Sequence, residues 1–299
     1  MKHKLSQVVI QKRKELDLTQ EGLAELTGLS RSTIARVERG EIENKDSYTL
    51  NTIRVALGLS LEVIAISIDT QTKTRMENEL FELVKHVFSK DYQAADSGLE
   101  MFKEKYGAYK GQPYYDQIIL FAESLVFVHQ DIRQTGLNKA VKGIKISHPD
   151  IFLTKQKSKV NNSLDYQYIG MRAFSLIEYG LIKAIGDALF TQRKYSQAIK
   201  VYEAVLISLK KPIVDQSITT KLYSVICRNT ANALHKLNQN EQALTYIQQG
   251  VTYCKDSGNI RSLPSLYQLG SAICLALNDS ETAAIYQQKQ QVVSDLLSP

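Results

Sequence analysis

The sequence predicts an all-α protein with a small N-terminal helical domain and a larger C-terminal domain of repeated helical pairs. The 299 residues include only five prolines and fifteen glycines, and Leu, Ala, Gln, Glu and Lys occur in long runs. Such composition favours helices. With 43% hydrophobic residues, a chain of this length can build one or two domains with substantial cores.

The stretch from Thr19 to Gly40 predicts two short helices joined by a tight turn. Thr19 and Ser30 are each suited to cap the start of a helix, because a hydroxyl can accept from an unpaired amide in the first turn. Gly28 lies where the chain must turn back, and Gly40 where the second helix must end. The second helix then exposes a polar, cationic row, as DNA-reading helices do: Arg31, Ser32, Thr33, Arg36 and Arg39.

Three further helices complete a five-helix domain over residues 1–66. The first ends before Asp17, the fourth ends at Gly58 and the fifth spans 61–66. The polar, aperiodic residues 67–75 predict a linker, and 76–299 the second domain. The apolar residues expected to face inward in the N-terminal domain are Leu5, Val8, Val9, Leu16, Leu23, Ala24, Leu26, Ile34, Val37, Leu50, Ile53 and Leu57.

The net charge of +6 does not itself point to DNA. Residues 1–70 hold ten Lys/Arg and ten Asp/Glu, so the excess lies in 71–299. What favours DNA binding is charge asymmetry within the first domain, where the basic residues 12–14 and the arginines of the second short helix are segregated from an acidic loop. The acids of that loop are Glu41, Glu43 and Asp46.

The same stretch resembles the lambda-repressor-like (Cro/C1-type) helix-turn-helix domains. The residues that match are Gln20, Ala24, Gly28, Ile34, Val37, Glu38, Arg39 and Gly40. Gly22 departs from the pattern and should weaken its helix by roughly 1 kcal/mol relative to Ala. The second helix of this stretch is the one that reads DNA in such domains, and we call it the reading helix. The resemblance further implies that an Arg13–Glu38 pair ties the first helix of the domain to the reading helix.

These residues can be assigned roles in DNA binding. We expect Gln20 and Ser30 to bond backbone phosphates, which fixes register without reading sequence. Arg31 and Ser32 lie at the exposed start of the reading helix and Arg36 one turn on, so we expect them to reach base edges. Thr33 is expected at a thymine methyl or a phosphate. A dimer would read two half-sites about 34 Å apart in a near-palindromic operator.

From residue 76 onward one register recurs, in which a small residue precedes an alanine by twelve positions. The small residues are Gly186, Ala231 and Ser271, and the alanines are Ala198, Ala243 and Ala283, with an earlier echo at Tyr92 and Ala95. These spacings resemble tetratricopeptide repeats, whose paired helices stack into a superhelix with a concave face. Here 45 and 40 residues separate the alanines, where the repeat usually has 34.

Residues 139–159 break this regularity with six lysines and one acid, Asp150, around His148-Pro149. The lysines are Lys139, Lys142, Lys145, Lys155, Lys157 and Lys159. One interpretation is a solvated loop or helix end. The other is a cationic rim for an anionic ligand terminus or for DNA phosphates.

The whole architecture resembles the peptide-pheromone receptors of Gram-positive bacteria, the Rgg, PlcR and PrgX group. The resemblance implies a cytoplasmic homodimer that binds double-stranded DNA, and a short signalling peptide on its concave repeat surface that changes DNA binding. The repeat register places six polar residues on that surface: Lys183, Asp187, Arg228, Asn232, His235 and Gln268. We expect Asn232 and Gln268 to pair with peptide backbone groups, and Arg228 or Lys183 with a carboxylate.

Other classes of function find less support. No glycine-rich phosphate loop, H-E-x-x-H or nucleophile elbow occurs, and the five histidines lack ligand spacing, so we expect no enzyme, cofactor or metal site. No membrane span or signal peptide is predicted, and the separated cysteines Cys227, Cys254 and Cys274 read as buried thiols. Two alternatives stay open: a ligand-independent repressor of a mobile element or phage, and an adaptor whose repeats bind a protein partner.

Overall fold

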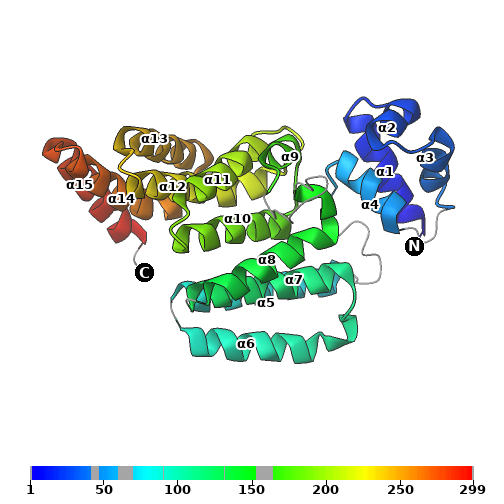
Figure 1. Cartoon of the computed structure of the whole chain (residues 1–299), viewed down its shortest axis with the longest axis horizontal. Coiled ribbons are helices and arrows are strands. Elements are labelled where there is room, and N and C mark those ends of the chain that lie inside the picture. Colours follow the sequence, from blue (N-terminus) through cyan, green and yellow to red (C-terminus); the bar gives the residue numbers. More distant parts are fainter. Residues whose placement is uncertain are drawn as a thin grey trace, which may run out of the picture. The chain divides into compact units, whose positions relative to one another are not determined.

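The computed structural model confirms the predicted all-α fold (Figure 1). It describes residues 2–41, 47–59, 70–89, 91–130, 132–152 and 164–297. None of the helices in these ranges is long and apolar enough to cross a membrane. The chain divides into two compact units: unit 1 is Met1–Asn161 with Arg172–Leu181, and unit 2 is Asn162–Met171 with Ile182–Pro299.

Unit 1 begins with the four described helices of the N-terminal domain: α1 (Lys2–Glu15), α2 (Gln20–Thr27), α3 (Arg31–Glu38) and α4 (Ser47–Ala56). The helices share one hydrophobic core, and eight residues predicted to face inward are buried in it: Val9, Leu23, Ala24, Ile34, Val37, Leu50, Ile53 and Leu57. Leu26 was expected in this core and is instead 58% exposed. It lies at the edge of the stripe that Leu23 and Ala24 define, so the last turn of α2 directs it to solvent.

The predicted caps are present. Thr19 Oγ1 accepts from the Gly22 amide at 2.9 Å, and Ser30 Oγ accepts from the Thr33 amide at 3.1 Å. Gly28 and Gly40 adopt left-handed φ values of 68° and 71°, which a residue without Cβ adopts at little cost. Local hydroxyl and glycine chemistry therefore sets both ends of the helix-turn-helix.

The linker prediction is wrong over residues 70–75. These residues form the first turns of α5 (Thr70–Phe88). They are polar, but the helix they begin is stabilised by the packing of its apolar stripe, which starts at Met76. Residues 67–69 and the predicted fifth helix, 61–66, lie outside the described residues.

The rest of unit 1 consists of paired helices: α6 (Tyr92–Lys105), α7 (Pro113–His129) and α8 (Arg133–Ser147), with the 3-10 turns η2 (Gly107–Tyr109) and η3 (Pro149–Ile151). Ala95, the predicted small residue of α6, is fully buried. Residues 139–147 of the lysine-rich segment belong to α8. There Lys139 pairs with Glu123 at 2.6 Å, while Lys142 and Lys145 are exposed. Lys155, Lys157 and Lys159 lie outside the described residues.

A buried ionic cluster in unit 1 centres on Arg54 of α4, which is 2% exposed. Its guanidinium donates to the carbonyls of Leu59 and Ser147, each at 2.9 Å, and lies 3.2 Å from the carboxylate of Glu178. Nε2 of His148 lies 3.3 Å from the same carboxylate. Burial lowers the pKa of His148. Burial raises the pKa of Glu178, but His148, Arg54 and the Ser175 amide outweigh it, so that pKa lies below its usual range.

Unit 2 contains α9 (Tyr166–Met171), α11 (Tyr195–Leu209), α12 (Gln216–Lys236), α13 (Asn240–Ser257), η4 (Ile260–Ser262), α14 (Leu263–Ala276) and α15 (Ser280–Leu297). It also contains α10 (Leu176–Thr191) from Ile182 onward. Figure 1 shows α12 beside α13 and α14 beside α15, each pair antiparallel. The residues of the predicted register are buried where the paired helices pack: Ala198, Ala231, Ala243, Ser271 and Ala283.

The backbone repeats this register independently of the small residues. Arg193, Asn238 and Asn278 follow α10, α12 and α14, and each has a φ of 59° or 60°. Each lies five positions before the buried alanine of the next helix. The same left-handed turn therefore closes all three helical pairs, and two of the three positions hold asparagine, which tolerates this conformation best after glycine.

We predict that Arg54→Met lowers the free energy of unfolding by about 3–5 kcal/mol, because the Glu178 carboxylate stays buried without its cation. The double variant with Glu178→Gln removes that charge and should recover part of the loss. Urea unfolding measures both. Arg39→Met serves as the control. Arg39 forms an exposed ion pair with Glu41, so its loss should cost less than about 1 kcal/mol. A similarly small loss for Arg54→Met would contradict the assignment.

We also predict opposite effects for two glycine substitutions. A Cβ at Gly22 would meet only ordinary contacts at 3.5 Å and beyond, so Gly22→Ala should stabilise the first domain by roughly 0.5–1 kcal/mol. A Cβ at Gly186 would lie 2.5 Å from the Tyr202 ring, so Gly186→Ala should destabilise by about 1–3 kcal/mol. Thermal unfolding of both variants tests this, and the same sign for both would count against it.

Candidate functional site

Two apolar side chains anchor the reading helix α3 in the core of its domain, and its polar side chains point outward. Ile34 and Val37 are buried, and Arg31, Ser32 and Arg36 are exposed. Because 3.6 residues make one turn, this division leaves one continuous face of α3 in solvent. That face holds every residue predicted to reach base edges.

Hydroxyl groups cluster at the start of α3. Ser30 Oγ lies 2.8 Å from both Ser32 Oγ and Thr33 Oγ1. In the free protein these three hydroxyls bond one another, and each can exchange such a bond for a phosphate oxygen. Together with the amides of the first helical turn, they make the start of α3 a suitable phosphate contact.

The arginines of α3 are less free than the sequence suggested. Arg31 pairs with Glu21 at 2.5 Å, and Arg39 forms two bonds to Glu41 at 2.6 and 3.0 Å. Arg36 has no ion-pair partner among the described residues. The charge asymmetry expected from the sequence is therefore partly neutralised inside the domain, because acidic side chains distant or adjacent in sequence fold back onto two of the three arginines.

The predicted Arg13–Glu38 pair is confirmed and ties α1 to α3. Arg13 donates to the two Glu38 oxygens at 2.6 and 3.1 Å, and to the Leu18 carbonyl at 2.8 Å. Gln20 donates its amide to Glu38 at 2.8 Å. Burial raises the pKa of Glu38, but the bonds from Arg13 and Gln20 outweigh it and lower that pKa overall. Gln20 is thus held at the start of α2 by a bond that the sequence did not reveal.

A cleft of about 540 Å³ runs along the side of α3 that faces α1 and α2. The Glu38 side chain and two arginines are among the groups that line it. The residues that line it are Ile10, Gln20, Arg31, Ser32, Ala35, Glu38 and Arg39. Three predicted DNA-binding residues, Gln20, Arg31 and Ser32, therefore share one hollow surface. Arg39, which the site prediction omitted, completes it and could be found from its spacing of eight from Arg31.

In unit 2 the structure brings three of the six predicted peptide-binding residues into one network. Lys183 donates to Asp187 at 2.5 Å within α10. The other Asp187 oxygen accepts from Tyr202 at 2.8 Å and from Asn229 at 3.1 Å, and Arg228 donates to Asn229 at 3.2 Å. Asn229 links α12 to α10 and was missed by the sequence analysis, although it lies three residues before Asn232 on the same helix.

The remaining three predicted residues lie apart from this network. Asn232 is half-buried one turn further along α12, and Gln268 is exposed on α14, which packs beside α12. His235 Nδ1 lies 2.7 Å from Asn240 Oδ1 at the turn between α12 and α13. The surface of α10 and α12 therefore offers a charged network beside a half-buried amide, while His235 is engaged at the turn.

The three cysteines are buried free thiols, as predicted. Burial raises the pKa of Cys227 to about 12 and also raises those of Cys254 and Cys274. At neutral pH all three stay protonated, and none belongs to either surface described above.

Comparisons with known proteins agree with this architecture. Residues 9–64 match the helix-turn-helix family model HTH_3. No curated protein sequence matches the chain.

Three solved structures share the fold over nearly the whole chain. PlcR of Bacillus thuringiensis, solved with the peptide PapR7 and DNA, superposes with a TM-score of 0.56 at 15% identity, covering 99% of this chain and 95% of that one. The apo competence regulator ComR of Streptococcus vestibularis gives 0.56 at 14%, covering 100% and 94%. Apo ComR of S. thermophilus gives 0.55 at 15%, covering 100% and 95%. Residues 9–64 are therefore a helix-turn-helix DNA-binding domain, and the chain as a whole has the fold of PlcR and ComR.

Proposed function

We propose that this protein is a transcription regulator whose helical-repeat domain binds a short signalling peptide that changes its affinity for DNA. The observation that carries the proposal is the polar surface of α10 and α12, on a fold whose relative PlcR was solved with both a peptide and DNA. The regulator would act in the cytoplasm as a homodimer, reading two half-sites of a near-palindromic operator about 34 Å apart.

On the DNA side, the exposed face of α3 would enter the major groove. Arg36 is available at once, whereas Arg31 must first leave Glu21. Because that pair is exposed on both sides, its loss costs little, at most about 1 kcal/mol. Gln20 and the hydroxyls at the start of α3 would bond phosphates and fix the register. Arg13 and Glu38 would hold α1 against the reading helix without touching DNA.

On the peptide side, Asn232 and Gln268 would pair with backbone amides of an extended peptide, and Arg228 or Lys183 with a carboxylate. Asp187 already accepts three bonds in unit 2, so its role would be to orient Lys183 and Asn229. His235 would act at the turn next to Asn240. By linkage, such a peptide changes DNA affinity only if it binds the free and DNA-bound forms differently.

We predict that Arg36→Ala weakens specific DNA binding by about 1–3 kcal/mol through loss of a base contact. The measurement is affinity for the gene's upstream region at fixed salt, by fluorescence anisotropy. Lys85→Ala removes one exposed positive charge outside the DNA-binding domain and should leave affinity unchanged. Equal losses in both variants would mean that only overall charge matters, which would sink the assignment of Arg36 to base reading.

The peptide part is tested with synthetic peptides encoded by short reading frames beside the gene. One peptide should shift DNA affinity at least several-fold, and Asn232→Ala or Arg228→Ala should abolish that shift while basal DNA binding persists. Gln242→Ala and Arg261→Ala, exposed residues of matching chemistry, should respond as the parent does. Specific binding that ignores every peptide would instead indicate a ligand-independent repressor, and absence of specific binding an adaptor.

A further inference from the structure

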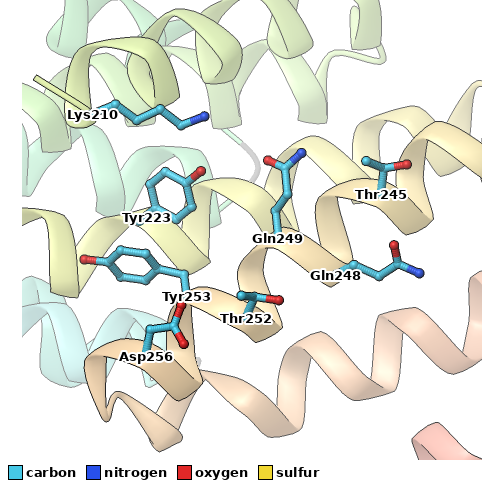
Figure 2. A pocket seen from close by; sticks show the side chains of 8 residues that line it. All are labelled: Lys210, Tyr223, Thr245, Gln248, Gln249, Thr252, Tyr253 and Asp256. Atoms are coloured by element: carbon cyan, nitrogen blue, oxygen red, sulfur yellow. The ribbon is translucent and has the colours of Figure 1, made fainter.

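A second cleft lies in unit 2 on α13, with α12 and the end of α11 (Figure 2). Its volume is about 430 Å³, within the roughly 300–1,000 Å³ of small-ligand pockets. None of the six residues predicted to bind the signalling peptide lines it. The residues that do are Lys210, Tyr223, Thr245, Gln248, Gln249, Thr252, Tyr253 and Asp256.

The wall of the cleft is one face of α13. From Thr245 to Asp256, each member has another three or four residues away, which places them all on a single helical stripe. Nearby, Tyr246 donates to Glu203 at 2.8 Å and so holds α13 to α11. The stripe is polar and exposed apart from the half-buried Tyr253, so neighbouring helices do not use it for packing.

Tyr223 forms the apolar floor. Only 7% of it is exposed, and its ring lies 4.6 Å from the ring of Tyr253. Its hydroxyl has no hydrogen-bond partner in the described part of the chain and is open to the cleft. Burial raises the pKa of Tyr223 to about 12, so the hydroxyl remains a neutral donor at physiological pH.

Two further donors face the same space. Lys210 is exposed, its Nζ lies 5.9 Å from the centre of the Tyr223 ring, and it pairs with no carboxylate among the described residues. The Gln249 amide is likewise without a partner there. Figure 2 shows the Lys210 ammonium and the Tyr223 hydroxyl close together, with the end of the Gln249 side chain beside them.

An ammonium, a neutral hydroxyl and an amide are the donors that a carboxylate accepts from. We propose that this cleft binds the carboxylate of a short peptide segment, held by Lys210, Tyr223 and Gln249. The adjoining amide groups of the segment then lie along the stripe of α13. There Gln248 and Thr252 offer donors and acceptors, and the Asp256 carboxylate accepts an N–H. The site is separate from the peptide surface of α10 and α12, and either can exist without the other.

The test uses the full chain labelled with ¹³C in its tyrosine rings. Tyr223→Phe and Tyr253→Phe identify the two ring signals by their disappearance. Three probes are titrated: acetyl-Gly-Gly-Gly with a free carboxylate, the same tripeptide as its amide, and acetyl-Gly-Asp-Gly amide. We expect the free acid to shift the Tyr223 and Tyr253 signals saturably and the amide not to do so. A response to the aspartyl probe shows that a side-chain carboxylate is also accepted, and its absence that the terminal one is required.

Lys210→Met keeps the apolar stem and removes the charge, and it should weaken the free acid about tenfold. Its neighbour Lys211→Met does not line the cleft and should bind as the parent does. The proposal is overturned if the amide binds as well as the acid, if neither tyrosine signal responds, or if the two lysine variants behave alike. Failure of the signalling-peptide response would leave these outcomes unaffected.

Discussion

Arg54 carries its positive charge into the interior of unit 1, and the packing of α4 there depends on how that charge is compensated. A buried guanidinium is costly unless it is paired and hydrogen-bonded. Here two carbonyls and the Glu178 carboxylate supply the bonds, and the edge of the His148 ring closes the cluster. Since Glu178 belongs to α10 and Ser147 to α8, one side chain of the DNA-binding domain satisfies groups from two later helices.

Features set by neighbouring residues could be predicted from the sequence. Thr19, Ser30, Gly28 and Gly40 act within one helical turn, so hydroxyl and glycine chemistry suffices to place the helix ends. The buried small residues of unit 2 follow a fixed register, and that register is long enough to identify repeats even though their length departs from the usual one. Resemblance to a known architecture then supplied the order of the domains, and the fold shared with PlcR supports it.

Features set by residues distant in sequence could not be predicted. Arg54 and Glu178 are 124 positions apart, and no periodicity connects them. The carboxylates that hold Arg31 and Arg39 were counted as separate surface charges, because composition says nothing about which side chains meet. The role of Asn229 could not be predicted for a related reason, because its side chain on α12 donates to Asp187 on a different helix, α10. Leu26 shows the reverse error, an apolar residue that the local pattern placed inside and the tertiary fold leaves outside.

The buried thiols of unit 2 have a chemical consequence. Oxidants and electrophiles attack the thiolate, and a thiol with a raised pKa and no solvent access offers almost none. With Cys227, Cys254 and Cys274 all protonated and enclosed, peroxide or glutathione disulfide meets no reactive thiol in the folded molecule. Oxidation of the folded molecule would therefore fall on exposed methionines such as Met101 and Met171, and not on its thiols.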